Sequence, residues 1–133
     1  MKLRVMSAKV VFICGSALRG QPDHENLKSA KFLRAAKTAP KYRLHSVGNG
    51  WHPGIYEVAS GGISIPGELY EMTDEQYTYL ESNEPPNMYP QAVELEEGGS
   101  AIAFLYPQSL IEEHGWPDIS DYGGWAAYKA ATA

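Results

Sequence analysis

The spacing of apolar and polar residues predicts a chain of short strands with a few helices. Residues 9–14 are almost continuously apolar and rich in β-branched side chains, which is typical of a strand buried on both faces. Apolar and polar positions alternate over residues 42–47, which predicts a second strand. Further strands are expected at residues 55–58 and at 63–72, the latter with a bulge or edge at Pro66-Gly67. Residues 91–96 and 100–106 are expected to form a hairpin across Glu97-Gly98-Gly99.

Helical spacing of apolar residues appears in four places. The longest pattern covers residues 25–37, and Asp23 is placed to cap it. Residues 73–76, Thr-Asp-Glu-Gln, have the sequence of a capping box and predict a helix that runs to about residue 83. Shorter helices are expected at 109–114 and at 125–129, the latter capped by Ser120 or Asp121.

The order of these elements predicts an α+β fold, a small mixed and mostly antiparallel β-barrel flanked by helices. The length of 133 residues fits one domain over residues 1–133, and no linker or repeat divides it. Cys14 is the one cysteine, so no intramolecular disulfide can form, and we expect a reducing, cytoplasmic location. No apolar run has transmembrane length, so no membrane partner is expected.

Charge bears on the kind of partner. The net charge is −5 and no basic face is evident, which argues against a nucleic-acid partner. Lys and Arg nevertheless gather in the first third of the chain, which favours an anionic small ligand there, although a solvated helix face gives the same pattern. We therefore expect a small acidic metabolite as partner. A homodimer is also possible through the aromatic residues of the tail, which could equally close the core: Trp116, Tyr122, Trp125 and Tyr128.

The loop that follows the first strand is the first candidate binding element. Its residues 15–18, Gly-Ser-Ala-Leu, end a buried strand with a glycine, so several backbone N–H groups can converge with little obstruction. Such a group of amides, helped by the Ser16 hydroxyl, suits a carboxylate or an oxyanion. An ordinary turn has the same sequence features, so the loop alone does not decide the function.

Two carboxylates are candidates for acid–base chemistry. Glu84 follows a predicted helix C-terminus, where the helix dipole disfavours negative charge, and Glu81 lies one turn earlier. Pro85 restricts the backbone of Glu84, which fixes the direction of its side chain. Glu68, in the strand over residues 63–72, is the rival base or binding group. Either residue could instead be a solvated surface acid.

Metal and cofactor chemistry is not indicated. The four histidines have no metal-ligand spacing, and one cysteine cannot form a cysteine zinc site. Phosphate-loop, dinucleotide and Ser-His-Asp patterns are also missing from the sequence. We therefore expect no metal and no organic cofactor.

Several segments resemble a known superfamily. Residues 12–20 resemble the YGSL-x-x-G opening of the γ-glutamylcyclotransferase-like superfamily, which includes plant avirulence-induced proteins. Residues 67–70 resemble its GE-[LIV]-[YW] strand, and residues 80–89 resemble its LD-x-x-E-x-P-x-x-Y segment. The resemblance implies that Glu84 is the acid–base residue and that the loop holds the charged end of the substrate. We also expect Glu68 and Tyr89 to contact the substrate.

A second resemblance covers more of the chain. Residues 32–44, residues 61–70 and the tail over residues 118–128 are similar to the C-terminal domain of allophanate hydrolase, a domain that resembles the same superfamily. Cys14 matches the CG opening of that domain, where the cyclotransferases have Tyr. The amidase domain of an allophanate hydrolase is not in this sequence.

The resemblances leave three functions open. The first is a γ-glutamylcyclotransferase that releases 5-oxoproline. The second is an enzyme of urea-related nitrogen metabolism that acts on a small carbamate or carboxylate, such as N-carboxycarbamate, with Glu68, His24 and the loop as its polar groups. The third is a non-catalytic module that binds a small molecule.

Overall fold

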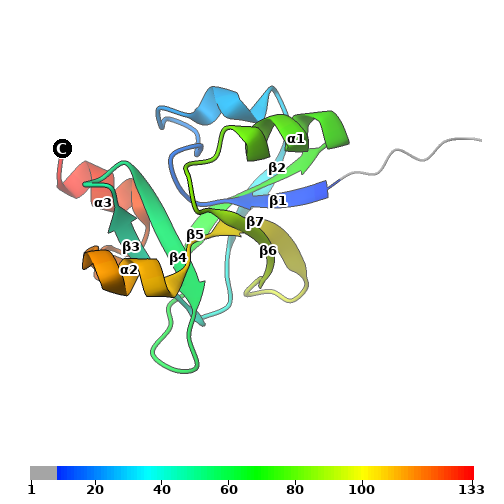
Figure 1. Ribbon diagram of the computed structural model, residues 1–133. Helices are drawn as coiled ribbons and strands as arrows, with labels where there is room; N and C mark the ends of the chain where they lie inside the picture. Colours follow the sequence, from blue (N-terminus) through cyan, green and yellow to red (C-terminus); the bar gives the residue numbers. More distant parts are fainter. Residues whose placement is uncertain (1–8) are drawn as a thin grey trace, which may run out of the picture.

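A computed structural model describes residues 9–133, which form two β-sheets with short helices around them (Figure 1). The larger sheet has five strands in the order β2-β5-β1-β7-β6. The smaller sheet pairs β3 with β4. The strands are β1 (Lys9–Ile13), β2 (Lys31–Lys37), β3 (Tyr42–Val47), β4 (His52–Glu57), β5 (Pro66–Met72), β6 (Tyr89–Glu94) and β7 (Ser100–Leu105).

The first strand is the centre of the large sheet, as its apolar sequence predicts. β1 pairs antiparallel with β5 on one side and parallel with β7 on the other. Its last three residues, Val11, Phe12 and Ile13, are buried. All other strand pairs of the two sheets are antiparallel. The expected α+β class with a mostly antiparallel sheet is therefore confirmed.

The large sheet curls but does not close into a barrel within residues 9–133. Its outer edges meet at one bridge, between Thr38 after β2 and Leu95 after β6. Two backbone hydrogen bonds flank this bridge, from the Ala39 N–H to the Glu94 carbonyl and from the Glu96 N–H to the Lys37 carbonyl, both 2.9 Å. The expected barrel is thus an open, strongly curved sheet. Continuous pairing of the edges stops here because the chain turns from β2 into β3.

Short helices cover the outside of the sheets (Figure 1). The capping box is present, with the Thr73 side chain accepting from the Gln76 N–H and the Gln76 side chain accepting from the Thr73 N–H. For the last helix the predicted caps are wrong, because Ser120 and Asp121 form a separate 3₁₀ turn and Gly124 is the N-cap. The helices are η1 (His24–Leu27), α1 (Asp74–Ser82), α2 (Gln108–His114), η2 (Ser120–Tyr122) and α3 (Trp125–Ala131).

The helix expected over residues 25–37 is wrong. Only the 3₁₀ turn His24–Leu27 is helical, and Lys28 and Ser29 then adopt left-handed conformations with φ of 52° and 61°. The remainder is β2, which pairs along the whole of β5. Its residues are good helix formers, but a strand position beside β5 satisfies their backbone groups, and this tertiary pairing outweighs the local preference.

Both sheets share a hydrophobic core. Buried side chains from β1, β3, β4, β5 and β7 form one contact cluster, joined by Leu80 of α1 and Trp125 of α3. In the part of the chain that the structure describes, each helix is too short or too polar to cross a bilayer.

Candidate functional site

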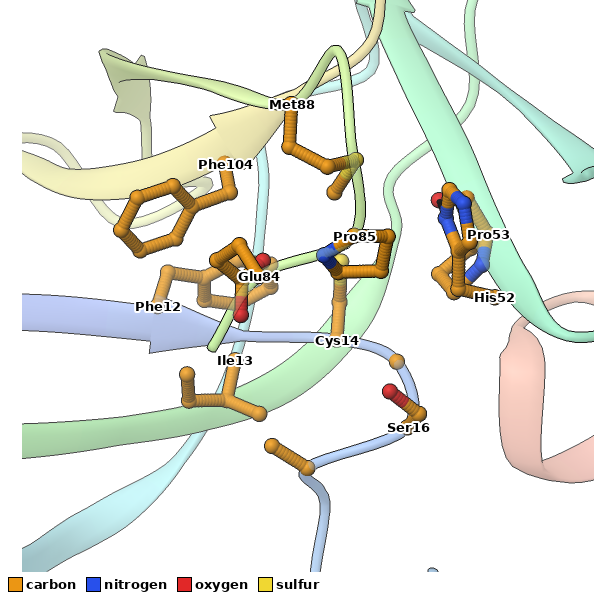
Figure 2. Close-up of a pocket in the computed structure, with 12 residues that line it drawn as sticks. Phe12, Ile13, Cys14, Ser16, His52, Pro53, Glu84, Pro85, Met88 and Phe104 are labelled. Atoms are coloured by element: carbon orange, nitrogen blue, oxygen red, sulfur yellow. Dashed lines mark hydrogen bonds between the residues drawn. The ribbon is translucent and has the colours of Figure 1, made fainter. Parts of the chain in front are cut away.

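A small cavity lies beyond the end of β1, between the two sheets. Its volume is about 50 Å³. Figure 2 shows side chains from β1, the loop that follows it, β4, β7 and the segment after α1 meeting around this space. The lining residues are Phe12, Ile13, Cys14, Gly15, Ser16, Ala17, His52, Pro53, Glu84, Pro85, Met88 and Phe104.

The loop after β1 has its carbonyl groups occupied. The Gly15 carbonyl accepts from the Leu18 N–H at 3.0 Å, and the Ser16 carbonyl accepts from the Asp23 N–H at 2.9 Å. The Ala17 carbonyl accepts from Nδ1 of His24 at 2.9 Å. Each of these bonds fixes the orientation of a peptide plane, and the loop is therefore held before any ligand binds.

The amides of the same loop are available. Among the described residues, the N–H groups of Gly15, Ser16 and Ala17 donate to no protein acceptor, and all three residues line the cavity. The Leu18 N–H is used within the loop, so it is not a free donor. Three consecutive amides without a protein acceptor beside a cavity are donors of the kind that suits a carboxylate or oxyanion.

Close packing against β4 sets the position of the loop. A Cβ added at Gly15 would lie 2.5 Å from Cγ of Pro53, closer than any real contact. Only glycine therefore lets the loop approach β4 so closely. β4 begins at His52, three residues before the strand expected at 55–58, so His52 and Pro53 line the cavity although the sequence did not indicate them.

The segment after α1 delivers Glu84 to the opposite wall. The Glu84 N–H donates to the Glu81 carbonyl, so it continues the last turn of the helix. A β-turn follows, in which the Met88 N–H donates to the Pro85 carbonyl and Asn87 has a φ of 74°. This is the backbone of a type II turn with proline first. Figure 2 shows the carboxyl of Glu84 between Phe12 and Cys14.

Glu84 is half-buried, and the loss of hydration around its carboxyl changes its protonation. Loss of hydration, with a smaller contribution from the Asp23 carboxylate, raises the pKa of Glu84 to about 7. The neighbouring acid is therefore Asp23, which follows the loop, and not Glu81 as the sequence suggested. A carboxyl that titrates near neutrality can both accept and donate a proton at physiological pH.

The other titratable groups in the lining are uncharged. Burial, with a contribution from Glu84, raises the pKa of the Cys14 thiol to about 12. Burial also lowers the pKa of His52, whose Nδ1–H donates to the Pro53 carbonyl at 2.9 Å. Glu84 is thus the lining group whose charge changes close to pH 7.

Two residues expected to contact the substrate lie elsewhere. Glu68 accepts from Arg19 and from the Tyr70 hydroxyl and does not line the cavity. Tyr89 begins β6 opposite Leu105, is 37% exposed and is also outside the lining. Met88, the residue before Tyr89, lines the cavity in its place. Residues 9–133 contain no cluster of His, Cys, Asp and Glu side chains suited to a metal ion.

Comparisons with known proteins point to two related groups. Residues 9–130 match the family described as the allophanate hydrolase C-terminal domain. The chain is 32% identical over 122 residues to urea amidolyase of Saccharomyces cerevisiae, covering 87% of this chain and 7% of that protein. It is 30% identical over 98 residues to γ-glutamylaminecyclotransferase C of Danio rerio, covering 68% of this chain and 64% of that protein.

A solved structure has a similar fold. Kluyveromyces lactis allophanate hydrolase superposes with a TM-score of 0.87 and 26% identity, over 96% of this chain and 22% of that protein. The chain thus spans a small fraction of the urea amidolyase and of the allophanate hydrolase. The similarity concerns one domain of those enzymes.

Proposed function

The chain belongs to the family of the allophanate hydrolase C-terminal domain, within the γ-glutamylcyclotransferase-like superfamily, and on this basis we propose that it is a γ-glutamylcyclotransferase-like enzyme. Homologues that carry the cyclotransferase name support this type of activity. The observation that carries the proposal is the arrangement of one cavity: a carboxyl with a pKa of about 7 on one wall and three free amides on another.

The proposed reaction is intramolecular. The α-amine of a γ-glutamyl compound attacks its own γ-carbonyl carbon, so a C–N bond forms and the bond to the leaving amine then breaks. Glu84 accepts a proton from the attacking amine and returns a proton to the leaving amine. The products are 5-oxoproline and a free amine, and proton transfer is balanced within the cycle. The site mainly has to fold the substrate and move protons.

The loop amides provide the other half of the proposed mechanism. The N–H groups of Gly15, Ser16 and Ala17 hold the α-carboxylate of the substrate or the oxyanion that develops at the γ-carbonyl. The bonds to the Gly15 and Ser16 carbonyls fix the peptide planes that carry the Ser16 and Ala17 N–H groups, and they keep these two donors in place before binding. No energy is then lost in ordering the loop at the moment of reaction.

The size of the cavity favours a partly enclosed substrate. Its volume of about 50 Å³ is small compared with pockets of about 300 Å³ or more that enclose drug-sized ligands. The 5-oxoproline-forming end would therefore enter, and the leaving amine would remain at the mouth. The cavity therefore does not restrict the leaving amine to a small group.

The family match favours a second candidate. Because residues 9–130 match the allophanate hydrolase C-terminal domain, the same cavity could act on a small carbamate or carboxylate of urea-related nitrogen metabolism. Release of carbon dioxide from N-carboxycarbamate, without activity on γ-glutamyl compounds, would support this candidate over the first. Binding of such ligands without any turnover would identify a binding module.

Turnover tests the proposal. Purified protein is incubated with a panel of γ-glutamyl amines and amino acids, and release of 5-oxoproline is measured for the wild type and Glu84→Gln. We expect kcat to fall by about 100-fold or more in the variant, the loss typical of removing a general acid–base group. Glu81→Gln is the matched control, because Glu81 is exposed one turn before Glu84. Full activity in Glu84→Gln would contradict the proposal.

A further inference from the structure

The loop of residues 15–20 begins and ends beside one residue of β5 that lies outside the cavity, Glu68. Ile13, the last residue of β1, is directly opposite Glu68 in the register of β1 and β5. Arg19, near the other end of the loop, donates its backbone N–H to Oε1 of Glu68 at 3.2 Å and its Nε to Oε2 at 3.0 Å. The loop therefore leaves the sheet beside Glu68 and returns to it.

Neighbouring side chains hold this carboxylate in place. The Tyr70 hydroxyl donates to Oε1 of Glu68 at 2.9 Å. The guanidinium of Arg19 lies over the ring of Phe32, with its central carbon 4.0 Å from the ring centroid. The Glu68 side chain is 13% exposed, whereas that of Arg19 is 56% exposed. Glu68 is thus the buried anchor, and Arg19 closes over it from the surface.

Glu68 and the loop residues that line the cavity border two different spaces. Gly15, Ser16 and Ala17 line the cavity, but neither Glu68 nor Arg19 does. Glu68 and Arg19 instead line a groove on the other side of the loop, beside α3. Glu68 therefore cannot touch a ligand in the cavity, and any effect on that ligand must pass through the loop.

We propose that Glu68 is a positioning residue that fixes the loop amides for a substrate carboxylate. This inference rests on the proposed function, in which those amides bind the α-carboxylate or the developing oxyanion, and it assigns them to the α-carboxylate. The Arg19–Glu68 pair closes the loop and thereby holds the three loop amides beside the cavity. Without the anchor, the loop loses its return point on β5, and the amides no longer converge.

The test compares Glu68→Gln with Glu97→Gln. Glutamine at position 68 keeps one acceptor oxygen, but its NH₂ group faces a donor of Arg19, so the closure is broken. Glu97 also pairs with an arginine, Arg34, on the surface of the same sheet. The two variants therefore make the same chemical change, and only one affects the loop. KM and kcat for the preferred γ-glutamyl compound are measured for both.

A positioning role predicts a change in binding. We expect KM of Glu68→Gln to rise by about tenfold or more, with kcat within about twofold of Glu97→Gln, because the loop amides bind ground and transition states alike. The pH at which kcat/KM is half-maximal should stay at its wild-type value, since Glu84 is untouched. Loss of kcat at unchanged KM, or equal KM in the two variants, would overturn the proposal.

Amide hydrogen exchange separates this inference from the proposed function. The Leu18 and Asp23 N–H groups donate within the loop and to it, so their exchange reports its order. We expect exchange at both amides to be about tenfold faster in Glu68→Gln than in Glu97→Gln. This result stands even if the wild type turns over no γ-glutamyl compound, which would refute the proposed function alone. Equal exchange in the two variants would refute the anchor.

A second variant keeps the proposal testable if Glu68→Gln does not fold. Tyr70→Phe removes the hydroxyl that donates to Glu68 and leaves the Arg19 contacts. We expect the same direction of change in KM and in exchange, with a smaller size than in Glu68→Gln. If Tyr70→Phe changes neither quantity and Glu68→Gln does not fold, the anchor is structural only and the proposal is overturned.

Discussion

At the scale of single residues, the environment of Glu84 decides what the cavity can do. Phe12, Cys14 and Phe104 surround its carboxyl with poorly hydrating groups, and Asp23 adds a negative charge nearby. Both effects disfavour the carboxylate. A residue that is an ordinary surface acid by its type therefore titrates close to neutral pH, which the proposed role in proton transfer requires.

The raised pKa of Glu84 has a consequence for stability. Because the folded pKa of about 7 lies above the ordinary 4.5, folding favours the protonated form. The stabilisation that comes from this raised pKa is fully present below pH 4.5 and is lost as the pH rises through 7. The free energy of unfolding falls by at most about 3 kcal/mol over this range. We expect Glu84→Gln to remove this part of the pH dependence and to be more stable than the wild type at pH 8. Urea unfolding at pH 5 and pH 8 measures it, and identical pH dependence in both proteins would contradict it.

Gly15 controls how closely the loop approaches β4. In Gly15→Ala, the new Cβ would lie 2.5 Å from Cγ and 2.6 Å from Cδ of Pro53, a ring that cannot move aside. We expect kcat/KM to fall by about tenfold or more, because a displacement of this size misplaces the amides that are proposed to bind the substrate.

The matched rescue for this change is the double variant Gly15→Ala/Pro53→Ala, which removes both clashing ring atoms. Its kcat/KM should recover most of the loss relative to Pro53→Ala alone. A double variant as impaired as Gly15→Ala would show that contact with Pro53 is not the cause.

Some of the residues that line the cavity could be predicted from the sequence, and others could not. Glu84 and the Gly15–Ala17 amides could be named because a glycine after a buried strand and a Glu-Pro step after a helix are local signals. The wall from β4 and β7 has no local signal, because Pro53 and Phe104 reach the cavity only through the folding of distant strands. Asp23 was missed as the neighbour of Glu84 for the same reason.

At the scale of elements, α1 and the turn after it present Glu84. The helix has only nine residues, and Leu80 is its one fully buried side chain, so its ends contribute much of its stability. We expect Thr73→Ala to destabilise the protein by about 1 kcal/mol through loss of the N-cap bond. Thr78→Ala, on the exposed face of the same helix, is the control and should change stability by less than about 0.5 kcal/mol. Equal losses in chemical unfolding would show that the cap does not matter.

Elements with strong local signals were predicted well. The buried strand β1, the alternating strand β3, the capped helix α1 and the hairpin β6–β7 agree with their sequence patterns. β2 was predicted as a helix because Ala, Leu, Lys and Arg favour helices locally. Its strand conformation comes from pairing with β5, which the sequence of β2 does not encode by itself.

At the scale of the whole molecule, Thr38 joins the edges of the curved sheet to the loop before β5. It is fully buried, its N–H donates to the Ile65 carbonyl, and its hydroxyl accepts from the Ile65 N–H at 2.9 Å. The bridge to Leu95 is formed by the same residue. One buried polar side chain therefore links the point where the sheet edges meet to the segment before β5.

Replacing this side chain tests its importance for the fold. We expect Thr38→Val to cost about 1–3 kcal/mol, because the isosteric change leaves the Ile65 N–H buried without an acceptor. Thr78→Val makes the same substitution at an exposed position and should have a small effect. Urea unfolding of both variants measures the difference, and equal stabilities would contradict this role of Thr38.

The protonation of Glu84 links the three scales, since the curved sheets create the cavity, α1 presents the side chain and burial sets its pKa. The most direct test is an NMR titration of the Glu84 side-chain carboxyl carbon in the wild-type protein, with the resonance assigned by comparison with Glu84→Gln. We expect a midpoint near pH 7, matching the pKa of about 7. A midpoint near the ordinary 4.5 would contradict it, because Glu84 would then be a hydrated acid and a poor proton carrier at neutral pH.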